Sequence, residues 1–188
     1  MNEKITISDI AGFCPEEAVW KMLADVCIAA QEGRRCSLSP DSIIYDGDTF
    51  VIEETSEKPD SFTAPEAQGH ATTDEPQMVW SIGAVSYYAA TGRQLFGGRG
   101  SAYQREHPSV ELPTLPKKFQ RMSSLIQSCL DANPSKRPSI KDIAEQAQKG
   151  LASHKFLHPT EHTVSQRTIQ KDTTDPLGDK WPEEMAEV

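Results

Sequence analysis

Residues 78–91 read MVWSIGAVSYYAAT, and this stretch decides the fold of the chain. Its apolar side chains do not keep to one stripe of a helix but recur on nearly every side, which is typical of a helix surrounded by other helices. Gly92 follows directly and suits the left-handed position at which many helices end. The stretch therefore predicts a buried central helix in a mainly α domain.

On both sides of this helix, apolar residues recur at steps of three and four, which predicts further core-facing helices. These are expected at residues 15–32, near 101–106, from 119 to Asn133-Pro134, and from a cap at Ser139 to about 151. The last helix has Asp142 three residues after its cap, a weak capping box.

A short two-stranded β-ribbon is predicted between the first two helices. The apolar runs 43–45 and 49–52 are separated by Asp46-Gly47-Asp48, a combination that favours a tight hairpin. A β-like stretch at Ile5 and Ile7 precedes them. Residues 53–77 have no periodicity, so we expect a long loop there.

The composition changes beyond about His158, where Thr, Gln, Asp, Glu and Pro predominate. Apolar residues in this part are too sparse to offset the entropy lost on ordering. We therefore expect a domain over 1–155 and a disordered acidic tail over 156–188. Within the tail, Leu177 and Trp181 are a possible docking peptide, although a solvated tail with one chance Trp explains them equally well.

Charge and cysteine usage restrict the function classes. The chain has a formal net charge of −9 and no long basic run, which argues against binding nucleic acid through its phosphates. Its four cysteines have no CxxC spacing, as expected for free thiols in a reducing compartment, so we expect a cytoplasmic protein. No apolar stretch is long enough to span a membrane, and we expect no cofactor.

Five short motifs, taken in order, resemble those of a protein kinase C-lobe, the helical half of the kinase fold. They are LSPDSII at 38–44, TAPE at 63–66, VWSIG at 79–83, TGRQLF at 91–96 and NPSKRPS at 133–139. In kinases the corresponding strings are LKPENIL, APE, VWSLG, TGxxPF and NPxxRPS. Each string is weak alone, but their order and spacing over roughly residues 5–153 imply a kinase C-lobe-like fold.

The resemblance also implies one structural ion pair. In the family the glutamate of APE pairs with the arginine of NPxxRP and anchors the activation segment to the lobe. This chain has both residues, Glu66 and Arg137. A bidentate carboxylate–guanidinium pair depends on the Arg fork, so keeping both partners implies that the fold is maintained.

The positions that the resemblance makes catalytic are replaced. Arg35-Cys36-Ser37 stands where kinases have His-Arg-Asp, so the catalytic aspartate becomes Ser37, which cannot act as a base near neutral pH. Ser42 replaces a magnesium-binding asparagine, and Met78 replaces the aspartate that supports the catalytic loop. Glu54, or Glu53 one register earlier, stands where the metal-binding aspartate of DFG would lie.

The N-lobe is also expected to be absent. The stretch before Leu38 is too short for its five-stranded sheet and contains no GxGxxG or VAIK-like string. Degenerate C-lobes of this kind resemble the kinase non-catalytic C-lobe domain (KIND), which in spire-type proteins binds a peptide of a partner. We therefore expect a catalytically inactive, pseudokinase-like module that acts in protein–protein interaction or scaffolding.

Two rival functions remain open. One is the regulatory half of a split kinase, in which a partner chain supplies the N-lobe and the ATP site. The other is an active enzyme with relocated catalytic residues, for which Asp41, Asp46 and Asp48 are the candidate carboxylates.

Two further patterns are set aside. The histidines at 154, 158 and 162 recur every four residues, but Pro159 interrupts the helix that would align them as metal ligands. The glycine-rich run 97–100 follows a helix and no Walker lysine follows it, so we interpret it as a connector.

Overall fold

The computed structural model describes residues 4–54, 60–67 and 74–157, with side chains described as far as Ser153. The chain divides into two compact units, Met1–Ala152 and Ser153–Val188. The account below concerns the first unit. Of the second unit only residues 153–157 are described, and they are helical. The predicted domain boundary at 155 and the tail from 156 stay predictions.

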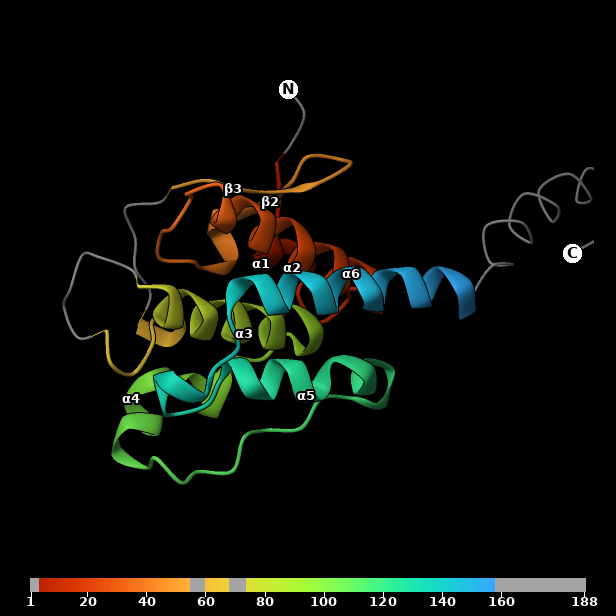
Figure 1. The fold of residues 1–188 in the computed structure, drawn as a ribbon. Coiled ribbons are helices and arrows are strands. Elements are labelled where there is room, and N and C mark those ends of the chain that lie inside the picture. Colours follow the sequence, from red (N-terminus) through yellow and green to blue (C-terminus); the bar gives the residue numbers. More distant parts are fainter. Residues whose placement is uncertain (1–3, 55–59, 68–73, 158–188) are drawn as a thin grey trace, which may run out of the picture. The chain divides into compact units, whose positions relative to one another are not determined.

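The first unit is mainly helical, as predicted (Figure 1). Its α-helices are α1 (Ile7–Ile10), α2 (Glu16–Gln31), α3 (Glu75–Thr91), α4 (Gly100–Glu106), α5 (Gln120–Cys129) and α6 (Ile140–Leu157). Short 3₁₀ turns lie at Pro40–Ser42, Asp60–Phe62, Leu95–Gly98, Lys117–Phe119 and Pro134–Lys136.

The central helix has the environment that its sequence predicts. α3 packs against α2 on one side and α5 on the other, and Met78, Val79, Trp80 and Val85 have no exposed surface. Gly92 ends α3 at φ 68°, and its N–H donates to the Tyr88 carbonyl. The helix begins at Glu75 rather than at Met78, because Pro76 is tolerated in a first turn where its missing N–H costs nothing.

The small sheet has one strand more than predicted. β1 (Ile5–Thr6) pairs antiparallel with β2 (Ile43–Tyr45), which pairs antiparallel with β3 (Phe50–Ile52). The predicted two-stranded ribbon is therefore a three-stranded sheet in the order β1-β2-β3. Ile7, expected in a strand, instead begins α1, because the Asp9 carboxylate accepts the Thr6 N–H and hydroxyl and caps the turn.

Part of the expected loop over 53–77 is packed against the helices. Phe62 in the 3₁₀ turn is 4% exposed, and its ring meets that of Tyr88 edge-on at 5.6 Å between centroids. Gly100 lies so close to this turn that a Cβ there would be 2.7 Å from the Ser61 Cα. The described part of the segment is thus fixed to the domain.

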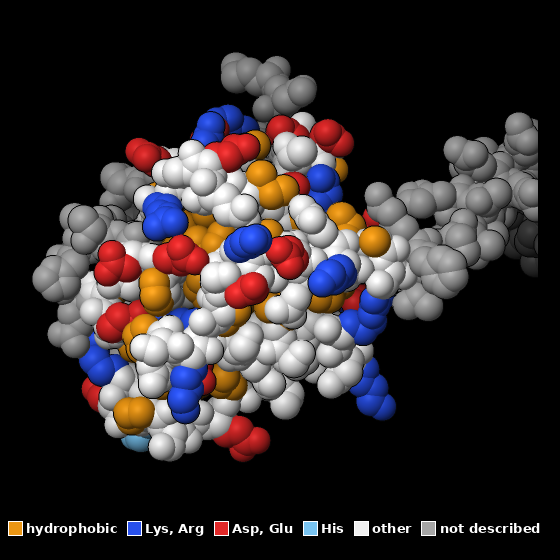
Figure 2. All heavy atoms as spheres, viewed as in Figure 1, with side chains coloured by type: hydrophobic (Ala, Val, Ile, Leu, Met, Phe, Trp, Pro, Cys, Tyr) orange, Lys and Arg blue, Asp and Glu red, His pale blue; other side chains and the backbone are white. Residues whose placement is uncertain are grey.

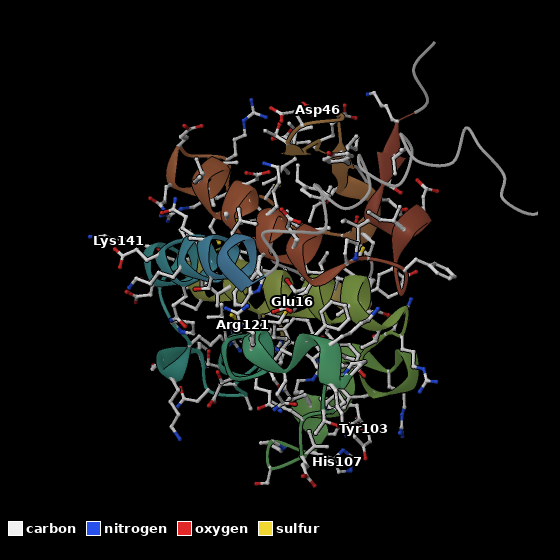
Figure 3. The ribbon with its side chains drawn as sticks, turned by 90° about the vertical axis from the view of Figure 1, so that its right-hand side faces the viewer. Glu16, Asp46, Tyr103, His107, Arg121 and Lys141 are labelled. Atoms are coloured by element: carbon white, nitrogen blue, oxygen red, sulfur yellow. The ribbon has the colours of Figure 1, made fainter. Side chains whose placement is uncertain are left out.

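Polar residues mark the two ends of the unit in Figure 3. Asp46 lies at the hairpin, whereas Tyr103 and His107 on and after α4 lie at the opposite end with their rings stacked 4.4 Å apart. Between them, Glu16 of α2 faces Arg121 of α5. On the face drawn in Figure 2, acidic and basic side chains are interspersed rather than gathered by sign.

Candidate functional site

The segment that resembles a catalytic loop, residues 33–42, runs from the end of α2 to β2. Ser37 is half-buried, and Ser42 is completely buried. The Ser42 hydroxyl accepts the Ser39 N–H and donates to the Ser39 carbonyl, both at 2.9 Å. Both bonding functions of this hydroxyl are therefore used to close the turn, and the carboxylate of Asp41, the middle residue of the turn, is exposed.

Met78 lies behind this segment on α3 and has no exposed surface. A thioether is a poor hydrogen-bond acceptor, so Met78 cannot hold loop N–H groups as a carboxylate would. Glu75, three residues earlier, contacts the loop instead. One of its oxygens lies 3.2 Å from Arg35 Nη2, and the other accepts the Ile140 N–H at 3.0 Å. Glu75 thus ties the loop to the start of α6.

Glu75 could not be identified from the sequence. The only signal was an acidic residue in the first turn of the central helix, and such residues are common there because they favour the helix dipole. Only the fold shows that its two oxygens serve different segments.

A cavity of about 360 Å³ lies between the loop and the end of β3. Gly33, Arg34, Arg35, Cys36, Ile52 and Glu54 line it. Burial, with a smaller contribution from the charge of Glu54, raises the pKa of the Cys36 thiol, so this thiol is protonated at neutral pH. The described lining of the cavity therefore offers two guanidinium groups and one carboxylate, and its thiol is not an activated nucleophile.

The two glutamates that the kinase resemblance places at the DFG position have different surroundings. Glu54 lines the cavity, whereas Glu53 forms an exposed ion pair with Lys4. Among the described residues that line the cavity, Glu54 carries the one carboxylate. A single carboxylate makes a poor magnesium site, because Mg²⁺ bound to nucleotide is commonly held by more than one protein oxygen ligand.

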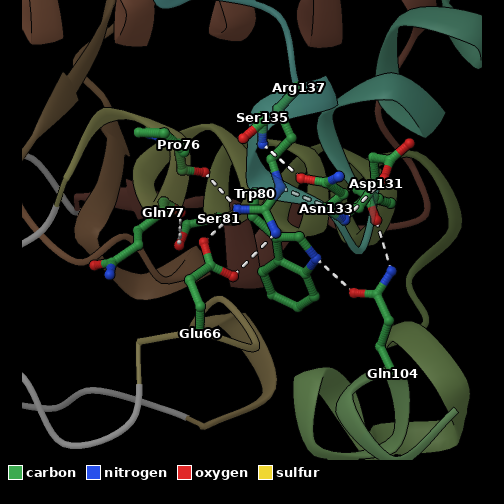
Figure 4. Close-up of polar contacts among 11 residues, drawn as sticks. Glu66, Pro76, Gln77, Trp80, Ser81, Gln104, Asp131, Asn133, Ser135 and Arg137 are labelled. Atoms are coloured by element: carbon green, nitrogen blue, oxygen red, sulfur yellow. Dashed lines mark hydrogen bonds and ion pairs between the residues drawn. The ribbon is translucent and has the colours of Figure 1, made fainter. Parts of the chain in front are cut away.

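Glu66 and Arg137 form a bidentate ion pair, drawn in Figure 4. The Arg137 side chain is fully buried and Glu66 is 29% exposed. Arg137 Nη2 lies 3.0 Å from Glu66 Oε2, Nη1 contacts the other carboxylate oxygen and the Pro76 carbonyl, and Nε donates to the Asp131 carbonyl at 2.8 Å. One guanidinium thereby joins the APE-like turn, the start of α3 and the turn after α5.

A second polar bridge lies beside this pair (Figure 4). The Trp80 indole N–H donates to Gln104 Oε1 at 2.8 Å, and Gln104 Nε2 donates to the Leu130 carbonyl at 2.7 Å. Gln104 is 2% exposed, so these bonds satisfy a polar side chain in the core. Gln104 could not be identified from the sequence, because a single Gln in a short helix belongs to no recognisable pattern.

The remaining candidate residues form no common site. Asp41 is exposed, and Asp46 accepts the N–H groups of Asp48 and Thr49, which is an ordinary role for Asp in a hairpin turn. Among the described residues no group of three or more His, Cys, Asp or Glu side chains is placed to hold a metal ion. The side chains of His154, His158 and His162, and all of Leu177 and Trp181, lie outside the described part of the chain.

The described helices include none that is both long enough and apolar enough to cross a membrane. The prediction of a cytoplasmic location stays a prediction.

Comparison with known proteins agrees with the fold. The chain is 28% identical over 116 residues to the serine/threonine-protein kinase ULK3 of Xenopus laevis, a match that covers 60% of this chain and 23% of the relative. It is 26% identical over 117 residues to the dual specificity protein kinase shkE of Dictyostelium discoideum, covering 58% and 16%. It is 24% identical over 132 residues to the Mast/stem cell growth factor receptor-related protein Kit of Xenopus laevis, covering 65% and 13%.

The matches therefore span less than a quarter of the length of each of these relatives. No protein-family model matches the chain. With the fold described above, these similarities identify the first unit as a helical domain like a protein kinase C-lobe, and the chain as similar to a fragment of a kinase.

Proposed function

We propose that this chain is a catalytically inactive, pseudokinase-like C-lobe module that acts by binding other proteins. The observation that carries the proposal is the closed turn at Ser42, whose hydroxyl is spent on the Ser39 backbone where a kinase would hold magnesium. Phosphoryl transfer depends on positioned charges and metal ions. A buried hydroxyl that is already hydrogen-bonded to its own turn provides neither, which supports an inactive site.

The contrast between the two parts of the domain supports the same proposal. The Glu66–Arg137 pair, which stabilises the fold, is bidentate, and the same guanidinium also donates to two backbone carbonyls. Ser37 and Met78, in contrast, offer no base and no carboxylate support. A fold maintained without its chemistry is what a binding module needs, by analogy with the KIND domain.

The alternative is the regulatory half of a split kinase. Its support is the 360 Å³ cavity, which remains open where the loop and the end of β3 meet and could face a nucleotide that a partner chain binds. In that case the partner would have to bring the glycine-rich loop, the lysine and most of the metal ligands.

A thermal-shift measurement of the full chain with ATP and Mg²⁺ tests the proposal. A ligand at a hundred times its Kd adds about 2.7 kcal/mol, which would raise the Tm of a domain of this size by about 5–10 °C. We expect no shift, and no transfer of radiolabelled phosphate from ATP to the chain or to a generic protein substrate. A shift or a labelled product would overturn the inactive module.

The binding half of the proposal is tested on the same protein by affinity purification from its native cells. We expect a stoichiometric partner, identified by mass spectrometry, that is retained by the full-length variant Trp181→Ala if binding lies on the C-lobe. Loss of the partner in that variant would place binding in the tail, and the absence of any partner would overturn the adaptor function.

A further inference from the structure

An apolar surface lies around Phe13, and the proposed function does not involve it. Phe13 is 89% exposed, and the other large hydrophobic side chains exposed among the described residues are Ile5 and Ile28, at 43% and 40%. Single exposed apolar residues are common, so exposure of Phe13 alone indicates nothing. Two further features distinguish Phe13, namely the backbone that holds it and the cavity beside it.

The backbone around Phe13 is held rigidly. Gly12 has φ 82°, and its N–H donates to the Ala89 carbonyl at the end of α3 at 2.9 Å. A Cβ at Gly12 would lie 3.2 Å from the Gly92 Cα, so the two glycines let these backbones approach closely. The next residue, Cys14, is 3% exposed. Phe13 is therefore presented from a fixed turn, which reduces the entropy lost on binding.

A cavity of about 300 Å³ opens beside this turn. Its apolar lining comes from both sides of Phe13 in the sequence and from the hairpin, and consists of Ile10, Pro15, Ala18, Tyr45 and Phe50. The Tyr45 and Phe50 rings lie 4.9 Å apart on neighbouring strands. Ile5 is directly opposite Tyr45 in the sheet and extends the same apolar row toward solvent.

We propose that this surface is an interface between two copies of the chain, in which Phe13 of each copy enters the cavity of the other. A two-fold interface needs a projection and a recess on the same patch, and here Ile10 and Pro15 of the recess flank the projection itself. A volume near 300 Å³ is at the lower end of ligand pockets and accommodates one aromatic side chain.

The charges around the cavity are also self-complementary. Glu17 and Lys21 line it from successive turns of α2, and Lys21 also lies 3.2 Å from Asp25. In the proposed dimer the two-fold axis is perpendicular to α2, so the two α2 helices run antiparallel and the acidic turn of each faces the basic turn of the other. Such an arrangement fixes register and disfavours unrelated partners.

The test is sedimentation equilibrium of the full chain at concentrations up to about 100 μM, which reveals a Kd in the micromolar range or tighter. We expect a concentration-dependent dimer. Phe13→Ser removes the projection and Ala18→Trp fills the cavity, and each variant should be monomeric over this range with an unchanged far-UV circular dichroism spectrum. Ile28→Ser is the control, because it removes an exposed apolar side chain about 15 Å beyond Ala18 along α2 and should leave the dimer intact.

Mixing the two variants gives the sharpest result. Phe13→Ser keeps its cavity and Ala18→Trp keeps its Phe13, so one of the two contacts can form between them and the mixture should associate more than either variant alone. A wild-type chain that stays monomeric, a dimer unaffected by Phe13→Ser, or a mixture without association would each overturn the proposal. None of these outcomes depends on whether the chain binds ATP or another protein.

Discussion

At the scale of single residues, Arg137 explains why a domain with replaced catalytic positions keeps its shape. Its side chain is fully buried and donates to one carboxylate and two backbone carbonyls, which come from three separate segments. A lysine could not reach these acceptors together, because the contacts use the planar fork of the guanidinium. The pair therefore fixes the APE-like turn at the start of α3.

Glu66→Gln should destabilise the domain by about 3 kcal/mol, because it leaves the buried guanidinium without a counter-charge. This value is at the lower end of the range for buried pairs, since Glu66 itself is 29% exposed. Urea unfolding at pH 7 measures the change. The matched control is Glu53→Gln in the exposed Lys4–Glu53 pair, for which we expect at most about 1 kcal/mol. Equal losses in the two variants would contradict the structural role of Glu66.

Single residues also show which features of the site could be predicted from the sequence. Glu66 and Arg137 were predicted to pair because the letters of two motifs are retained, and the structure brings them together. Ser42 was identified only as a replacement, since a sequence cannot show that a hydroxyl closes on the backbone three residues earlier. Glu75 and Gln104 carry no pattern, and their partners lie far away in the chain.

At the scale of elements, helix packing in this domain depends on two glycines inside helices. A Cβ on Gly150 of α6 would lie 2.5 Å from the Trp20 ring of α2, and one on Gly83 of α3 would lie 2.8 Å from the Cys129 Cβ of α5. Real Cβ atoms do not approach so closely, and the Trp20 ring is 4% exposed with neighbours around it. Each glycine thus sets how near two helices lie.

Gly150→Ala should destabilise the domain by about 1–3 kcal/mol, the usual cost of overpacking a core. The sign of the change in unfolding free energy is the test, because Ala in a helix interior is otherwise favoured over Gly by about 1 kcal/mol. Thermal unfolding followed by circular dichroism gives the difference. Gln148→Ala on the exposed side of α6 is the control and should leave the Tm nearly unchanged. A stabilised Gly150→Ala would show that α6 does not pack closely on Trp20.

The long elements, the β2–β3 hairpin and the short helix α4 were predictable, whereas the pairing of β1 with β2 and the helix α1 were not. α2, α5 and α6 each bury a periodic apolar face, and α3 is apolar on nearly every side; a sequence displays both patterns directly. β1 has two residues and α1 has four, too few for any period to appear. Their structure comes from partners at a distance: β2 completes the ladder of β1, and the Thr6–Asp9 cap begins α1.

At the scale of the whole first unit, the core is continuous from the sheet through α2 and α3 to α5. Three of its members are cysteines, Cys14, Cys27 and Cys129, each at most 3% exposed. Burial raises the pKa of the Cys27 thiol to about 12 and raises the pKa of Cys129 as well. Thiols in this state react only after the structure opens, so they report on how cooperatively the unit unfolds.

We expect a thiol reagent at pH 7 to label Cys36 first, because it is the half-buried cysteine and lies at the cavity beside Glu54. The pKa of the Cys36 thiol is raised above the ordinary 9.0. The rate at which Cys36 is labelled should therefore increase about tenfold per pH unit until the pH reaches this raised pKa. Cys27 and Cys129 should label together, at one slow rate set by global unfolding. Mass spectrometry of time points with and without urea follows all four sites, and Cys36→Ser is the control that removes only the fast phase. Independent labelling of Cys27 before Cys129 would mean that α2 and α5 leave the core separately and that the unit does not unfold cooperatively.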